Sequence, residues 1–559
     1  MVLLLGLSIP MMQCAPSGEE VTPPEEEVTP PEEVTPPPEE GEIQYGGRLN
    51  IGFTASQPSL SHYPGEMWTN WGCLWDLLVY DNWAHFNLPP DYYKLNLKFV
   101  QSYETSEDGL TWTLHLVENA TWHDGVPVTA EDIKFTCENW YCIPGNADID
   151  YCVDHVEVID DYTAKVVNTR ALTTVNTPGW WSWNPILPKH IYEPYKDNMS
   201  SYANEDSIGS GPFKLKEFKT EQYMWLVANE DYWGGRPYVD EVVFRHYGNL
   251  ETLVMALEKG EIDVFGNEDL PVALVEEFEA NPDIAVEMVP GLTLYSLVFN
   301  LHKDTPVQDK NVRHAIAYGI DKDRIIDMVY RGNAVKYDSW VYEEDPMYHP
   351  NLPQYDYDPD KANEILDGAG YIDSDGDGIR NDPATGDNLA FELLCSSADI
   401  DMIKTATLLN EMLPDIGVDV RIMTVDEDTF VTNIWNPTAD GFDVALRGED
   451  PSPSPYGDWI WLEAVSWGAG GDWWNPSYWS NPRFDELTAL LGTAQSKEER
   501  KEYMYEMQEL MSEELPEAFL VRPEFISAYR TDKFEGWINE IGGLVSWFNP
   551  WSILKVHLK

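Results

Sequence analysis

The chain has 559 residues, of which 98 are Asp or Glu and 35 are Lys or Arg, so its formal net charge is −63. This excess of negative charge argues against nucleic acid or anionic lipid as a partner, and it repels acidic ligands at low salt. Hydrophobic residues make up 43 % of the chain, which is enough to bury the cores of several domains. A solvated acidic surface that serves solubility also accounts for the charge.

Residues 2–12 are an apolar run that ends just before Cys14. The run is too short to cross a membrane as a helix. It resembles the end of a secretory signal followed by a lipoprotein cysteine, so residues 1–14 are predicted to be a signal segment with Cys14 as its lipidation site. An ordinary cleaved signal peptide is the alternative. Either interpretation predicts a protein outside the cell, and the first anchors it to a membrane through a lipid.

Residues 15–42 repeat the unit V-T-P-P-E-E and contain no large apolar side chain to bury. Proline favours polyproline II and the carboxylates repel one another, so this segment is predicted to be a disordered, extended tether. At about 3.1 Å per residue it would reach roughly 80 Å.

The rest of the chain alternates short strands with helices, which predicts an α/β fold with mixed sheets. Residues 46–53 read as a first strand, and residues 97–116 read as two strands joined by a turn at Asp108 and Gly109. Thr129 to Asp132 is a capping-box start for a helix that runs to about residue 140.

Four more segments extend this pattern. Residues 251–259 are predicted to form a helix closed by Gly260, followed by a strand over 262–265. Residues 291–301 and 519–530 are both strand-like.

Residues 305–332 predict two capped helices. Asp309 and Asp321 are N-cap residues, and Gly332 is the C-terminal stop. The side chains expected to face inward are Val312, Ala315, Ile316, Gly319, Ile325, Ile326 and Met328.

The order of motifs resembles a known family. Residues 305–332, TPVQDKNVRHAIAYGIDKDRIIDMVYRG, are similar to the segment P-x-x-D-x-x-V-R-x-A-I-x-x-x-I-D of the extracellular solute-binding proteins that feed ABC importers, in the family 5 branch for peptides, nickel and oligosaccharides. Other similar segments follow the family order: 108–136, 184–193, 208–218, 229–245, 256–266, 355–380 and 478–487.

The resemblance implies a periplasmic-binding-protein-like fold with two lobes, an extra inserted domain and a two-strand hinge at 291–301 and 519–530. It divides the chain into domain I (43–76, 207–290 and 528–559), the inserted domain II (77–206) and the closing domain III (291–527). It also implies a monomeric receptor that delivers a solute to the membrane subunits of an ABC permease. Peptide is the commonest ligand, an oligosaccharide comes close behind, and a nickel complex is third.

Two features bear on the ligand. Residues 445–461 take the place of a family loop that grips a peptide amino terminus, where Glu449 or Asp450 can act, although Ser452 replaces the second family Asp. Arg447 can pair with a ligand carboxylate or neutralise Glu449. Aromatic rings stack on sugars and cations, so the tryptophans of residues 459–479 are predicted to contact ligand, with the cluster at 180–183 as the second choice. The rings predicted to bind ligand are those of Trp459, Trp467, Trp473 and Trp474.

Asp373, Asp375, Asp377 and Asn381 stand at positions 1, 3, 5 and 9 of a calcium-loop pattern, with Gly378 at position 6. Position 12 is Ala384, where a Glu is usual. A structural calcium ion and a plain Asp/Gly-rich turn are the two interpretations.

Three of the six cysteines, Cys137, Cys142 and Cys152, fall close together, which favours one disulfide in an exported protein. A zinc set that adds His155 is the lesser alternative. No cofactor is required by any motif, and G-x-S-x-G, H-E-x-x-H and phosphate-binding glycine loops do not occur in the sequence. The protein is therefore predicted not to be an enzyme. The alternatives are a secreted glycoside hydrolase, motivated by tryptophans and carboxylates, and a structural cell-surface protein.

Overall fold

The computed structural model describes residues 43–61, 70–85, 96–106, 108–139, 153–168, 185–266, 270–435, 441–449, 475–494, 496–539, 543–545 and 551–559. The predicted signal segment, Cys14 and the tether lie outside these residues. The chain divides into a unit of residues 1–43 and a unit of residues 44–559, and the helices and strands of the described residues belong to the second. In these described ranges no helix has the length and apolar character needed to span a membrane.

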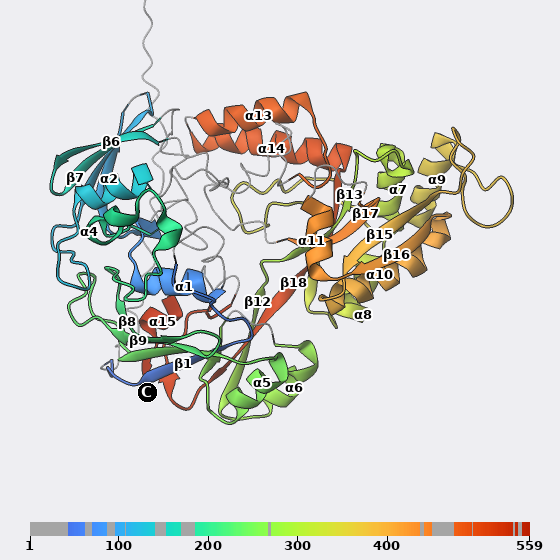
Figure 1. Ribbon diagram of the computed structural model, residues 1–559. Helices are drawn as coiled ribbons and strands as arrows, with labels where there is room; N and C mark the ends of the chain where they lie inside the picture. Colours follow the sequence, from blue (N-terminus) through green and yellow to red (C-terminus); the bar gives the residue numbers. More distant parts are fainter. Residues whose placement is uncertain are drawn as a thin grey trace, which may run out of the picture. The chain divides into compact units, whose positions relative to one another are not determined.

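Twelve of the described strands belong to one mixed sheet (Figure 1). Its main path is β16-β15-β17-β13-β18-β11-β1-β10-β9-β8, with β12 and β14 also paired to β18. The strands are β1 (Arg48–Phe53), β8 (Phe213–Lys219), β9 (Tyr223–Ala228), β10 (Glu241–His246), β11 (Val264–Phe265), β12 (Ile284–Pro290), β13 (Leu294–Phe299), β14 (Ala334–Lys336), β15 (Ala390–Ser396), β16 (Asp419–Val425), β17 (Val444–Glu449) and β18 (Glu517–Arg530).

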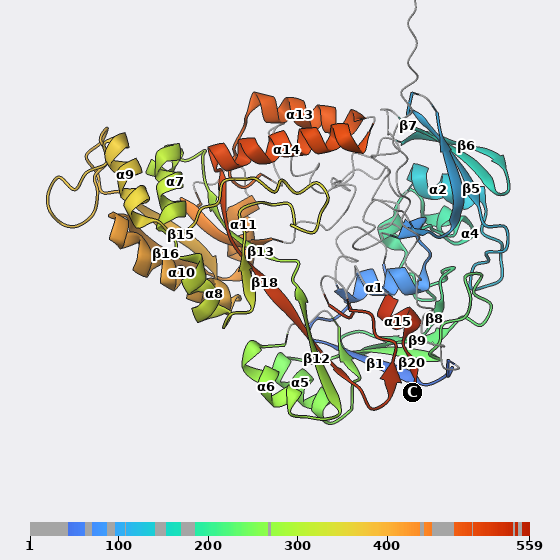
Figure 2. The same ribbon diagram turned by 180° about the vertical axis from the view of Figure 1, so that it is seen from behind.

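β18, with 14 residues, connects the two ends of this sheet. Its first half pairs with β13 and β14, and its second half pairs with β12 and β11. Figures 1 and 2 both show β18 and β12 running between the elements around β15 and those around β1. The prediction that residues 291–301 and 519–530 form strands is therefore confirmed.

A second, antiparallel sheet has the order β4-β5-β7-β6. The turn between β4 and β5 is the predicted one, because Asp108 Oδ1 accepts a hydrogen bond of 2.6 Å from Ser106 Oγ and Gly109 has a φ of 68°. Its strands are β4 (Val100–Thr105), β5 (Thr111–Leu116), β6 (Val153–Asp160) and β7 (Thr163–Asn168). Two short pairs complete the strands: β2 (Ala84–His85) with β3 (Asn96–Leu97), and β19 (Phe534–Glu535) with β20 (His557–Leu558).

Helices pack against both ends of the large sheet. α13 and α14 lie side by side in both views (Figures 1 and 2). The α-helices are α1 (Asn70–Val79), α2 (Ala130–Asn139), α4 (Lys189–Tyr192), α5 (Leu250–Glu258), α6 (Val275–Glu279), α7 (Lys310–Gly319), α8 (Lys322–Val329), α9 (Pro359–Ala369), α10 (Ile400–Met412), α11 (Glu427–Trp435), α13 (Pro482–Thr493), α14 (Lys497–Glu514) and α15 (Trp551–Lys555).

Local capping explains where several helices begin. The Asp309 carboxylate accepts from the N–H of Asn311 at 2.9 Å, and the Asp321 carboxylate accepts from the N–H of Arg324 at 3.0 Å. The capping box at α2 also forms, since Asp132 Oδ2 accepts from the Thr129 N–H at 2.8 Å. These predicted helix starts are confirmed.

The expectation that Met328 faces inward is wrong. Its side chain is 65 % exposed, and Val329 is buried in its place. Ile325 and Val329 are four residues apart, so they share the inner face of α8, and Met328 falls outside that stripe.

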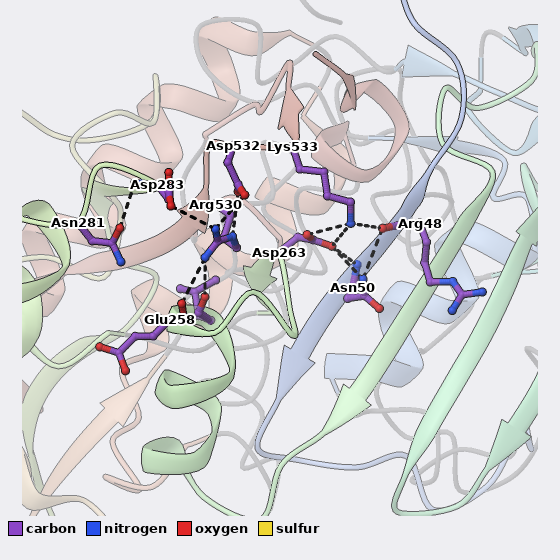
Figure 3. Close-up of polar contacts among 10 residues, drawn as sticks. Arg48, Asn50, Glu258, Asp263, Asn281, Asp283, Arg530, Asp532 and Lys533 are labelled. Carbon is purple, nitrogen blue, oxygen red and sulfur yellow. Dashed lines mark hydrogen bonds and ion pairs between the residues drawn. The ribbon is translucent and has the colours of Figure 1, made fainter.

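A polar network joins residues from all three segments predicted for domain I (Figure 3). The buried Asp263 carboxylate accepts from the Asn50 N–H at 2.7 Å and from Lys533 Nζ at 3.2 Å. On the neighbouring strand end, Arg530 pairs with Asp532 through two hydrogen bonds of 2.9 Å. The network fastens chain segments that are far apart in sequence, and the domain boundaries themselves stay predictions.

Candidate ligand-binding site

Three polar residues stand in the middle of the large sheet on adjacent strands. Ser296 on β13 lies opposite Arg447 on β17, and the Ser296 hydroxyl donates to the Glu517 carboxylate on β18. Arg447 is 4 % exposed and Glu517 is 5 % exposed. A buried cluster of charged and polar side chains within a sheet is a place to look for function.

The charges of this cluster influence one another. Burial raises the pKa of the Glu517 carboxyl, while the positive charge of Arg447 and the hydrogen bond from Ser296 act in the opposite direction. The sequence offered Glu449 as the carboxylate for Arg447 to neutralise. The structure adds Glu517 as a second carboxylate whose charge acts on Arg447.

β17 leads directly into the segment predicted to hold ligand. Glu449, its last residue, lies opposite Leu294, the first residue of β13. Residues 445–449 of the predicted loop are therefore part of a strand, paired with the crossing strand β13. Asp450, Trp459, Trp467, Trp473 and Trp474 lie outside the described residues, as do the tryptophans at 180–183.

Trp479, at the end of the predicted aromatic cluster, belongs to the interior. It is 6 % exposed and packs edge-on against Phe484 with ring centroids 5.0 Å apart. This ring anchors α13 in the core, which differs from the ligand contact expected of residues 459–479.

Sequence reasoning did not single out a second buried arginine. Arg522 on β18 is 2 % exposed, and its Nε donates to the Gly291 carbonyl at 2.7 Å. Its Nη1 pairs with Glu344 Oε2 at 2.8 Å, and its guanidinium lies 4.1 Å from the centre of the Tyr342 ring. Because Gly291 belongs to the other crossing segment, Arg522 ties the two crossings together.

The sequence did carry a signal for these residues. Ser296, Glu517 and Arg522 each interrupt an apolar strand, in LYSLVF, EAFLV and FLVRPEF. A charged residue at a buried strand position requires a partner, but the sequence does not say which one.

The calcium-loop residues come together on the surface. One carboxylate oxygen from each of Asp373, Asp375 and Asp377 lies within 4.8 Å of the others. The Asn381 Oδ1 atom already has a partner, because it accepts a hydrogen bond from the Ser374 N–H at 2.8 Å. The Asp373 carboxylate accepts from the N–H groups of Gly376 and Gly378, as in a plain Asp/Gly-rich turn.

The structure describes only part of the predicted cysteine cluster. Cys137 is buried on α2, whereas Cys142 and Cys152 lie outside the described residues. The His155 side chain is 46 % exposed, with its Nδ1 2.7 Å from the Asp154 carboxylate.

Residues 94–468 match the model of the bacterial extracellular solute-binding proteins, family 5, middle region. This match covers more than half of the chain, so the chain belongs to the family 5 extracellular solute-binding proteins. The oligopeptide-binding protein AppA of Bacillus subtilis (strain 168) is 28 % identical over 462 residues, which cover 77 % of this chain and 79 % of AppA. The nickel-binding periplasmic protein of Escherichia coli (strain K12) is 27 % identical over 336 residues, which cover 59 % of this chain and 63 % of that protein.

Solved structures show the same fold. AppA from Bacillus subtilis in complex with a nonapeptide has a TM-score of 0.72 at 22 % identity, covering 93 % of this chain and 100 % of AppA. The ABC transporter substrate-binding protein CtaP from Listeria monocytogenes has a TM-score of 0.77 at 22 % identity, covering 92 % of this chain and 100 % of CtaP. The predicted fold class is confirmed: this is a two-lobed binding-protein fold with mixed α/β sheets.

Proposed function

We propose that this protein captures an oligopeptide between its two lobes and delivers it, chemically unchanged, to the membrane permease of an ABC importer. The family match over residues 94–468 carries this proposal. The similarity to an oligopeptide-binding protein over most of both chains favours peptide among the family's ligands.

The proposed ligand contacts follow from where the predicted loop begins. β17 ends at Glu449 opposite the first residue of the crossing strand β13, and the carboxylate of Glu449 or Asp450 is proposed to hold a peptide amino terminus by charge. Arg447 lies on the same strand, and its positive charge is proposed to pair with a ligand carboxylate. The rings of Trp459, Trp467, Trp473 and Trp474 are proposed to stack on ligand side chains.

Two further roles are proposed from the sequence. The protein acts outside the cell as a monomer, held by a lipid on Cys14 and lifted by the tether of residues 15–42. Calcium stabilises the loop of Asp373, Asp375, Asp377 and Asn381, an idea supported by the spacing and by the three neighbouring carboxylates. Adding calcium to EDTA-treated protein should raise its thermal midpoint, and an Asp375→Asn variant should lose that rise.

Thermal-shift screening with peptide and oligosaccharide panels tests the proposal. A ligand that binds only the native state raises the midpoint of unfolding by mass action, and we expect peptides to do so. A midpoint raised by oligosaccharides alone would contradict the peptide assignment.

Ring-removing variants locate the site. Trp467→Ala, Trp473→Ala or Trp474→Ala should weaken peptide binding by about tenfold where the ring is an anchor. The matched control is Trp225→Ala on β9, whose ring is held by Lys216 at 3.7 Å at the other end of the large sheet. If all three variants bind like this control, the aromatic assignment fails, while the peptide assignment still rests on the panel.

A further inference from the structure

A cavity of about 380 Å³ is formed where the crossing strands meet the helices of both ends of the sheet. Its walls are residues 270–273, the link 291–293 between β12 and β13, the end of α8, the first turn of α10, and residues 523–525 of β18. A volume of this size falls within the range of small-molecule pockets, about 300–1,000 Å³. Among the residues predicted to bind the transported solute, Arg447 is the one whose side chain the structure describes, and it does not line this cavity.

Two opposite charges in this wall have no partner in the part of the chain that the structure describes. The Arg331 guanidinium and the Glu524 carboxylate both line the cavity, and neither forms a hydrogen bond or ion pair there. The Glu524 N–H donates to the Asn333 carbonyl at 3.0 Å, which keeps Glu524 beside the turn that carries Arg331. The other charged pair in the wall, Asp401 and Lys404, is already joined at 2.7 Å.

A buried hydroxyl also belongs to the wall. Tyr330 is 5 % exposed, and its hydroxyl has no hydrogen-bond partner of normal geometry within the described residues. The neighbouring Tyr295, with its ring centroid 6.1 Å away, differs because its hydroxyl donates to Asp399 at 2.7 Å. The side chains of Thr405 and Tyr295 nevertheless lie beside the Tyr330 hydroxyl, so this hydroxyl adds a polar group to the wall without requiring a ligand.

The remaining wall is apolar. Leu292 and Val329 are buried, while Ile400 is 61 % exposed at the first turn of α10. An exposed isoleucine beside buried aliphatic side chains offers an apolar group a place to bind.

We propose that this cavity binds a small zwitterion with an aliphatic side chain, of the class that a free aliphatic amino acid represents. Arg331 takes the carboxylate, Glu524 takes the ammonium group, and Leu292, Val329 and Ile400 contact the side chain. A zwitterion also suits a chain whose net charge of −63 repels anions. Since both crossings contribute to the wall, binding here is linked to any change in the angle between them.

Isothermal titration of the full chain with L-leucine, L-leucinamide and 4-methylpentanoate tests the proposal. Leucine should bind, and the two probes that lack one charge should bind about tenfold more weakly or worse. Arg331→Met should weaken leucine binding about tenfold. It should change the affinity for leucinamide by no more than about twofold, because leucinamide has no carboxylate for Arg331 to bind. Glu524→Gln should likewise weaken the binding of leucine but not that of 4-methylpentanoate, which has no ammonium group for Glu524 to bind.

Matched variants separate this cavity from any other leucine site. Ala273→Trp places a large ring in the wall, and Ala280→Trp places one on the exposed end of α6, away from the cavity. Arg421→Met and Glu279→Gln are the charge controls. Ala273→Trp should weaken leucine binding about tenfold relative to Ala280→Trp. No binding of leucine to the parent, or equal binding by Ala273→Trp and Ala280→Trp, would overturn the proposal.

Discussion

Each half of β18 carries an arginine whose side chain is largely buried, and the two arginines differ in their carboxylate partners. In the first half, Arg522 is 2 % exposed and donates to a buried carbonyl of the other crossing. At the far end, Arg530 meets Asp532, whose side chain is 43 % exposed, in the network that joins the segments predicted for domain I (Figure 3). Water screens the second pair but cannot replace the partners of the first. The Arg522 side chain is 2 % exposed and that of Arg530 is 12 % exposed, so the expected difference depends on how far water reaches each pair.

Arg522→Met gives the largest expected effect. The variant removes the donor to the Gly291 carbonyl and leaves Glu344 without its partner, so the free energy of unfolding should fall by about 3 kcal/mol. Urea unfolding, read from the midpoint at constant slope, measures the loss. Because Glu344 is a third exposed and can hydrate, Glu344→Gln should cost less than Arg522→Met. A loss below about 1 kcal/mol for Arg522→Met would show that this crossing is not fixed by its arginine.

Glu517→Gln tests how the buried carboxyl group in the first half of β18 makes stability depend on pH. Burial raises the pKa of Glu517 in the folded state, so the folded protein holds this proton more tightly than the unfolded chain does. The wild type should therefore lose stability relative to the variant as pH rises from the unfolded pKa of about 4.5 through the raised folded pKa. Within that window the loss should approach about 1.4 kcal/mol for each pH unit. Urea midpoints of both proteins at a series of pH values measure this. A difference that stays constant with pH would mean that the Arg447 charge offsets burial completely.

Arg530→Met gives the smallest expected effect, roughly 0.5–1 kcal/mol, and the loss should shrink as salt is added. The measurement is the same urea midpoint, at low and at high sodium chloride. A loss equal to that of Arg522→Met would erase the difference between the two halves of β18.

Local features of this fold were predictable from sequence, and distant pairings were not. Asp309, Asp321 and the capping box at Thr129 act within three residues of themselves, so the sequence predicts them directly. The family order of motifs predicted the fold and the two crossing strands. Met328 was misplaced because helical spacing alone does not choose between neighbouring positions at the end of a short helix.

The partners of Arg522 and Glu517 show where the sequence stops being sufficient. Arg522 meets Gly291 and Glu344, and Glu517 meets Ser296, all of them far away along the chain. Only the folded sheet brings them together. The same applies to the cavity of Arg331 and Glu524, whose walls come from five separate segments.

Native mass spectrometry of the full chain, incubated with a mixture of short peptides, tests the central claim most directly. We expect each chain to hold one peptide, which is released on denaturation with its mass unchanged. A chain that holds no peptide, or that releases shortened fragments, would contradict a receptor that captures oligopeptides and delivers them intact.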